Sequence, residues 1–208
     1  MRGSPASTID DARNVQVLLG TNSPNASSSF YARLINDVLA TKFKLVVGYQ
    51  GTSEAFLAIE RGETHGFPSI RYGALKSLRP DWVRNKRINM LLQFGGRPHP
   101  ELPDVPFLAD LVKSKDDKLL LDVALAPMQL GRPYFVGPGV PADRLAVLRA
   151  GFTSTFKDAG FRAEAERLAL EVDEQPVSGE QIENIIKIAY AAPQALIERL
   201  QKLYNATE

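Results

Sequence analysis

The sequence contains no cysteine and only two histidines. The absence of cysteine excludes thiol nucleophiles, disulfide bridges and thiolate metal sites. His65 and His99 lie far apart in the sequence, and neither has the neighbours that a closed metal site or a serine–histidine pair needs. The phosphate-binding motifs GxxxxGK[ST] and GxGxxG are also missing. We therefore expect no cofactor and no metal, and no acid–base pair indicates an enzyme.

An excess of charge of one sign is missing as well. The 25 Lys and Arg residues nearly balance the 24 Asp and Glu residues, and the formal net charge is +1. This balance is not that of a nucleic-acid-binding protein or a polybasic membrane anchor. No run approaches the ~18 apolar residues of a membrane-spanning helix, and residues 1–14 lack the apolar core of a secretory signal. The 208 residues, 44% of them apolar, suit a globular domain with a substantial appendage.

Hydrophobic periodicity predicts alternating strands and helices in the first half of the chain. The expected strands are 15–20, 43–49, 65–70 and 88–94, and the expected helices are 27–41, 53–63 and 72–78. Such alternation favours a parallel or mostly parallel sheet covered by helices. The four prolines of residues 95–106 predict a loop.

The second half of the chain reads mainly as helix. Residues 107–130 have a helical pattern, and residues 131–141 predict a short strand and a second Pro/Gly loop. The remaining residues form apolar stripes at helical spacing, which include Leu145, Leu148 and Phe152 in one segment and Ile182, Ile185 and Ile186 in another. Ser178 and Gln181 form a predicted capping box at the start of the latter.

Two polar corners follow the first two predicted strands. The first corner is GTNSPNASSS (residues 20–29), and the second corner is GYQGTSE (residues 48–54). Each feeds the start of a helix, where unpaired N–H groups and the positive end of the helix dipole favour an anion. If the two strands are neighbours, both corners open on the same edge of the sheet. The alternative is that these residues only cap helices and turn the chain.

The chain resembles the extracytoplasmic solute receptors of tripartite tricarboxylate transporters, the Bug or TctC-like family. The segments that carry the resemblance occur in the family's order: VLLGTNSPNASSSF, TKFKLVVGYQGTSEAFLAIERGE, RPDW, HPELPDVPFLADL, GRPYFVGPGVPADRLAVLRAGF and SGEQIENII. The resemblance runs from about residue 8 to the C-terminus. No single segment is very specific, but the ordered set is.

The resemblance implies an α/β fold with a type II periplasmic-binding-protein-like lobe, in which helices flank a mostly parallel sheet, plus a helical C-terminal extension. Residues 9–130 would form the second lobe, and 131–208 would form a crossover and part of an incomplete first lobe. The implied function is non-enzymatic binding of a small di- or tricarboxylate-like compound, with closure of a hinge near Gly131–Pro138. The ligand-binding positions it implies are Thr21, Asn22, Ser23, Ser27, Tyr49, Gln50, Gly51, Thr52 and Ser69.

The resemblance also implies partners and a location. The partners would be the small carboxylate and the membrane subunits of the transporter, with no nucleic acid. The location would be periplasmic, or cytoplasmic if the chain is a natural truncation, because the family's export signal and front portion have no counterpart here. Two further departures are the SPNAS turn in place of a glycine-rich GPGS-like turn, and Ser69 where many relatives carry Asp.

Two other functions stay open at this stage. The first is a truncated structural or interaction relative that has lost its ligand and forms a homodimer through exposed apolar stripes of its C-terminal helices. The second is a small α/β enzyme on an anionic substrate, which would need a base near Ser23 or Thr52. His65 is the only histidine remotely available for that role.

Overall fold

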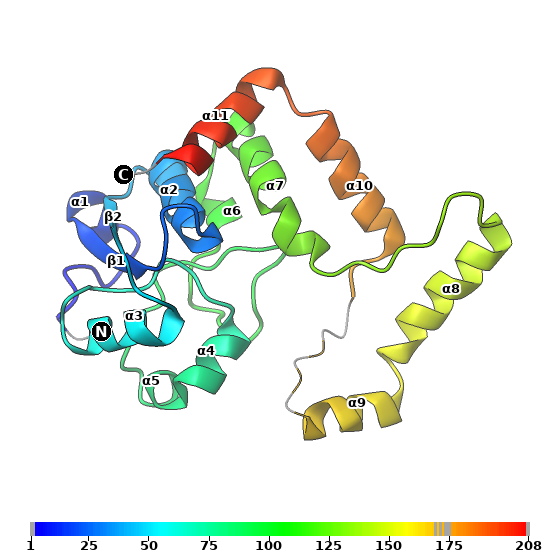
Figure 1. The fold of residues 1–208 in the computed structure, drawn as a ribbon, viewed down its shortest axis with the longest axis horizontal. Helices are drawn as coiled ribbons and strands as arrows, with labels where there is room; N and C mark the ends of the chain where they lie inside the picture. Colours follow the sequence, from blue (N-terminus) through cyan, green and yellow to red (C-terminus); the bar gives the residue numbers. More distant parts are fainter. Residues whose placement is uncertain (1–2, 169, 171, 173–175, 207–208) are drawn as a thin grey trace. The chain divides into compact units, whose positions relative to one another are not determined.

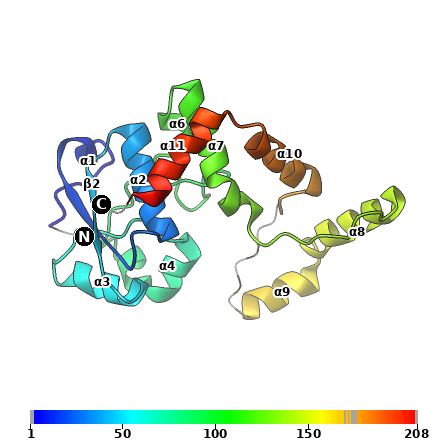
Figure 2. The same ribbon diagram turned by 45° about the horizontal axis from the view of Figure 1, so that its top comes forward.

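The computed structural model describes residues 3–168, 170, 172 and 176–206, which form a mixed α/β chain. The described residues divide into two compact units. Unit 1 comprises the chain up to Leu121 together with the segment from Pro193 onwards, and unit 2 comprises residues 122–192. Figures 1 and 2 show the ribbon from two directions. The lobes implied by the resemblance remain a prediction.

The sheet of unit 1 is a parallel pair among the described residues. Strand β1 (Val17–Thr21) pairs with β2 (Phe43–Val47), with Val17 opposite Phe43 and Thr21 opposite Val47. Helix α2 (Ser27–Leu39) makes the crossover between them, as the expected strand–helix–strand order requires. A single parallel bridge adds Gly66 beside Leu19, so the predicted third strand is reduced to one point of contact.

Helices surround this pair. Those of unit 1 are α1 (Asp11–Asn14), α3 (Thr52–Glu60), α4 (Tyr72–Leu78), α5 (Pro80–Arg84), α6 (Leu108–Leu111) and α11 (Gln194–Asn205). Helix α7 (Lys115–Leu130) starts in unit 1 and continues past Leu121. Unit 2 contains α8 (Ala142–Thr155), α9 (Ala159–Arg167) and α10 (Gly179–Tyr190). The predicted helices over 27–41, 53–63, 72–78 and 107–130 are therefore present, with α6 and α7 covering the last range.

The predicted strand at 88–94 is wrong. Within the described residues, only Gln93 makes a ladder contact, a parallel bridge to Phe107. The Gln93 side chain instead holds the proline-rich loop: its Nε2 donates to the carbonyl oxygens of Leu102 and Val105, and its Oε1 accepts from the His99 backbone N–H. This segment therefore makes its hydrogen bonds to the loop at 95–106 and does not extend the sheet. The predicted strand within 131–141 is likewise absent from this part of the chain, where three prolines lack the N–H that a ladder needs.

Unit 1 contains two apolar clusters. One gathers Val17, Leu19 and small residues beneath the sheet, with Phe43, Leu45 and Leu91 packed against it. The other centres on Trp82, which is 2% exposed and has its ring centroid 4.9 Å from that of Phe56. The Trp82 indole N–H donates to a Glu60 carboxylate oxygen at 3.2 Å. Trp82 is therefore part of the core of unit 1.

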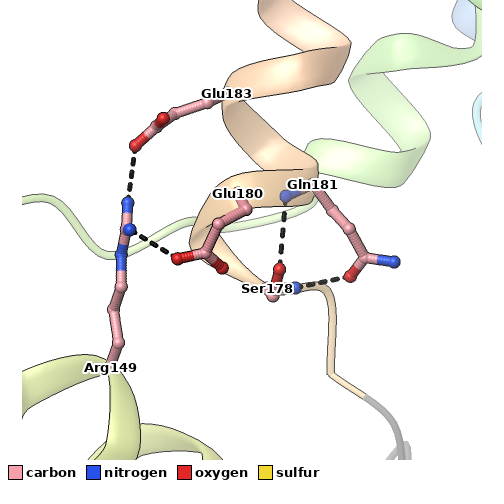
Figure 3. A network of polar contacts seen from close by, with 5 residues as sticks. All are labelled: Arg149, Ser178, Glu180, Gln181 and Glu183. Atoms are coloured by element: carbon pink, nitrogen blue, oxygen red, sulfur yellow. Dashed lines mark hydrogen bonds and ion pairs between the residues drawn. The ribbon is translucent and has the colours of Figure 1, made fainter. Parts of the chain in front are cut away.

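Unit 2 is organised by polar contacts. Ser178 and Gln181 form the predicted capping box at the start of α10, which Figure 3 shows. In the same view, the Arg149 guanidinium of α8 bridges Glu180 and Glu183 of α10, with N–O distances of 2.6 and 2.5 Å. Helices α8 and α10 contain no buried residue. Polar contacts at the surface therefore join these two helices, and an apolar core does not.

Candidate anion-binding site

The two corners open on the same edge of the sheet. Because β1 and β2 are parallel neighbours in register, Thr21 and Val47 end their strands side by side, and α2 and α3 both begin beyond that edge. The Tyr49 N–H also donates to the Thr21 carbonyl oxygen at 3.4 Å, which joins the start of the second corner to the first. The predicted adjacency of the two corners is confirmed.

The hydroxyl groups of the first corner are bonded to one another. Ser29 Oγ donates to the Ser23 carbonyl oxygen at 2.6 Å, so its only proton is used there. Thr21 Oγ1, 3.0 Å from Ser29 Oγ, must therefore donate to Ser29, and Ser28 Oγ must donate to Thr21 across 3.3 Å. Thr21 and Ser29 are completely buried. These three hydroxyls consequently have no proton left for an anion.

The backbone at the start of α2 keeps its donors. The first hydrogen bond of this helix runs from the Phe30 N–H to the Ala26 carbonyl oxygen. Within the described part of the chain, the N–H groups of Ser27, Ser28 and Ser29 donate to no protein acceptor. Three successive amides at the positive end of a 13-residue helix are suited to hold one carboxylate.

The other predicted residues of the first corner lie around these amides. Ser23 is half-buried and its Oγ accepts a hydrogen bond from the Asn25 N–H at 3.2 Å, which leaves the Ser23 hydroxyl proton available. Asn22 and Ser27 are exposed. Ser23 and Ser27 are therefore the two hydroxyls of this corner that can still donate to a ligand.

The second corner contains an acidic group of its own. Glu54, in the first turn of α3, accepts a hydrogen bond from the Gln50 N–H through its carboxylate. A carboxylate at this end of a helix is favoured by the helix dipole, as a bound anion would be. Gly51 is extended and Thr52 is the first residue of α3, one position before the predicted start at residue 53. The second corner is therefore negatively charged.

Tyr49 lies between the corners. A β-carbon at Gly20 would be 3.0 Å from Tyr49 Cε2, so the tyrosine ring rests on the glycine at the end of β1. Burial raises the pKa of Tyr49, and the carboxylates of Glu63 and Glu54 raise that pKa further. The Thr64 hydroxyl beside Gly20 is buried and has no hydrogen-bond partner among the described residues.

His65 is tied to the sheet. Its ring nitrogen Nδ1 accepts a hydrogen bond from the Leu18 backbone N–H at 3.0 Å, and the backbone N–H of His65 donates to the Leu18 carbonyl oxygen at 2.8 Å. This ring nitrogen cannot take a proton from a substrate while it accepts from Leu18. Ser69 lies four residues further on, half-buried and outside regular secondary structure. No hydrogen bond joins Ser69 to either corner among the described residues.

Arg33 is the residue of this region that sequence reasoning missed. It is only 8% exposed, and burial lowers its pKa. Its Nη2 donates to the Pro24 carbonyl oxygen of the first corner at 2.9 Å, while its Nε donates to the Leu203 carbonyl oxygen at 2.6 Å. Figures 1 and 2 show α11 lying beside α2 where this contact forms. The signal available in the sequence is a lone arginine between the apolar residues of the 27–41 pattern.

Other features of unit 1 lie away from these residues. A hollow of about 300 Å³ beside Trp82, Lys86 and Asn89 is lined by none of the predicted site residues. No cluster of three or more potential metal ligands occurs among the described residues. None of the helices described combines the length and the apolar content needed to cross a bilayer.

No protein-family model, no curated protein and no solved structure matches the chain.

Proposed function

We propose that this chain binds a small carboxylated compound at the first corner, as a solute-binding receptor component of a tripartite tricarboxylate transport system. The observation that carries the proposal is the group of three unpaired backbone amides at the start of α2, on the edge of the sheet shared by both corners. The family resemblance supplies the transport role. The type II periplasmic-binding-protein fold, the periplasmic location and the membrane subunits as partners belong to the same proposal.

The ligand would be held by a single helix N-terminus. Its carboxylate would accept hydrogen bonds from the amides of Ser27, Ser28 and Ser29, and the free hydroxyl protons of Ser23 and Ser27 would add to them. The carboxylate of Glu54 disfavours a second anionic group at the other corner. The expected ligand therefore has one carboxylate for the first corner and a hydroxyl, amine or neutral group toward the second.

The experiment removes the amide N–H of Ser27, together with its hydroxyl, without removing the helix. Proline at the first helical position lacks only an N–H that has no helical partner, and the residue before it must be extended. Ala26 has φ −65° and ψ 146°, so Ser27→Pro fits the native backbone. Ala142→Pro is the matched control, because Pro141 before it has φ −57° and ψ 145° at the start of α8 in the other unit.

The measurement is native mass spectrometry of gently purified protein, followed by a thermal-shift panel of mono-, di- and tricarboxylates. We expect a carboxylate-dependent rise in Tm that Ala142→Pro retains. Ser27→Pro should weaken binding about tenfold or more, since a hydrogen bond to a charged group contributes about 1.5–3 kcal/mol. Ser23→Ala should weaken it less. Equal binding by Ser27→Pro and the native chain would rule out the first corner as the site.

A second candidate function is a structural or interaction role without a ligand. The closed hydroxyl network of Thr21, Ser28 and Ser29 favours it, because the corner satisfies most of its own polar groups. An empty chain with no thermal shift across the whole panel would support this function. In the enzyme alternative, His65 Nδ1 would not serve as the base, since it accepts from the Leu18 backbone N–H.

A further inference from the structure

Unit 2 leaves large apolar side chains uncovered. Its helices α8 and α10 contain no buried residue, and Ala165 is the only buried residue of α9. Between the end of α7 and the middle of α9, eight large apolar side chains are exposed: Val136 and Val140, together with a set of six that comprises Tyr134, Phe135, Val147, Leu148, Phe152 and Phe161. We call this set the 134–161 surface. Helices of this kind are ordinarily stabilised by packing an apolar face, so this surface needs a partner.

Aromatic contacts give the 134–161 surface a fixed form. Tyr134 contacts Phe152 with ring centroids 5.5 Å apart. Phe152 contacts Phe156 at 5.0 Å, and Phe156 contacts Phe161 at 5.6 Å, both edge to face. The rings therefore form a continuous row from the loop before α8 to the start of α9. Tyr134 remains 86% exposed although it is part of this row.

We propose that the 134–161 surface is the contact between two copies of this chain. Its six side chains expose roughly 600 Å², taking about 200 Å² for each aromatic residue. A stable interface buries about 800 Å² on each partner, so these side chains supply most of what one copy must contribute. Exposed apolar patches of this size mark binding surfaces on soluble proteins.

A second copy suits this surface for reasons of charge and symmetry. The net charge of +1 gives two copies almost no mutual repulsion. Helix α9 carries both positive and negative side chains, with Arg167 paired to Glu164. The charged residues at the edge of the surface can therefore face α9 of a second copy without repulsion. A two-fold interface brings the same residues together from each side, and tilted or edge-to-face ring contacts can interdigitate in that arrangement. This inference is independent of ligand binding at the first corner.

The test is the mass of the full chain in solution, measured by light scattering and sedimentation over a wide concentration range. We expect a dimer that dissociates on dilution. The double variant Tyr134→Ser and Phe135→Ser changes two loop residues that are 86% and 77% exposed, so its fold should persist by circular dichroism. We expect its dimer dissociation constant to rise about thirtyfold or more, as for aromatic residues central to interfaces.

The matched control is Tyr190→Ser. Tyr190 is 89% exposed but lies at the end of α10, outside the 134–161 surface, and its loss should leave the dimer unchanged. An equal effect of both variants would contradict the proposal. A native chain that stays monomeric at the highest concentration would also contradict it. In that case, protection of residues 142–167 from hydrogen exchange would mean that the surface is covered within the monomer. Sedimentation with phosphatidylcholine vesicles would mean that a membrane covers it.

Discussion

At the scale of single residues, the acceptor to which each hydroxyl group donates its proton decides what the first corner can bind. Five hydroxyl-bearing residues lie within the first corner, and by composition all of them are candidate donors. The bond from Ser29 to the Ser23 carbonyl oxygen fixes the donors around Thr21, and the hydroxyls of three residues are thereby excluded. Thr21, a predicted ligand residue, stabilises the turn in this structure. The backbone amides remain as the main donors.

Glu54 makes a specific prediction about ligand charge. Replacing it by glutamine keeps an acceptor for the Gln50 N–H and removes the negative charge from the second corner. We expect Glu54→Gln to strengthen dicarboxylate binding about fivefold, because a like charge a few ångströms away costs about 1 kcal/mol near the surface. Monocarboxylate binding should change less. Titration calorimetry with a mono- and a dicarboxylate of similar length measures both.

The control for this change is Glu101→Gln, which removes the same charge from a residue outside both corners. If Glu101→Gln strengthens dicarboxylate binding as much, the effect comes from net charge alone. If Glu54→Gln weakens binding, the carboxylate of Glu54 contacts the ligand, and a hydroxyl or amine of the ligand is its partner.

The sequence permits a good part of this site to be predicted. The pairing of β1 with β2 and the position of both corners follow from hydrophobic periodicity and the strand–helix–strand order. Glu54, in the first turn of the predicted helix at 53–63, also indicates a carboxylate that turns back on the N-terminus of its own helix. The bond between Arg33 and the Leu203 carbonyl oxygen could not be predicted, because it joins residues 170 positions apart.

At the scale of elements, α2 ends in an unfavourable conformation. Its last residue is followed by Ala40, which has φ 55° and ψ 36°, the left-handed conformation that glycine adopts at little cost. We expect Ala40→Gly to raise the free energy of unfolding by about 0.5–1 kcal/mol. Urea denaturation followed by circular dichroism measures this change.

The control for this prediction is the same substitution inside a helix. Ala74 is an exposed residue of α4, and Ala74→Gly should lower the free energy of unfolding by about 0.5–1 kcal/mol. A loss of stability at Ala40 as well would mean that α2 does not end in the left-handed conformation. The two variants have the same change in composition, so only the backbone conformation distinguishes them.

The strand at 88–94 shows where periodicity misleads at this scale. Its apolar residues satisfy the pattern of a buried strand, yet the Gln93 side chain and backbone bond the proline-rich loop that follows. Apolar runs of this length are ambiguous because burial alone does not require a ladder. A glutamine inside the run is the only local sign of a different role. Helix α10 is easier to predict because its capping box, Ser178 and Gln181, is local in sequence.

At the scale of the whole molecule, Arg33 holds the returning C-terminal segment on unit 1. It donates to carbonyl oxygens of Leu203 and Tyr204 near the end of α11, where a cation also favours the helix dipole. We expect Arg33→Met to lower the free energy of unfolding by about 2–3 kcal/mol, because buried bonds to a charged donor are lost. Hydrogen exchange of residues 194–205 should rise with it.

Arg199 provides the comparison for this prediction. It also joins α11 to unit 1, through Asp37 and Asp117, but these side chains are partly exposed. Arg199→Met should cost less than about 1 kcal/mol. Equal effects of the two variants, or unchanged exchange of α11 in Arg33→Met, would contradict the anchoring role of Arg33.

The return of the chain to unit 1 also has a consequence for how the protein is made. Residues 122–192 are synthesised between the two parts of unit 1, and the Leu203 carbonyl group that Arg33 bonds follows it by 170 residues. While the ribosome adds those residues, the guanidinium has to stay hydrated and α2 lacks its neighbour. Unit 1 therefore completes its folding only after α11 has left the exit tunnel, well after its first part has been made.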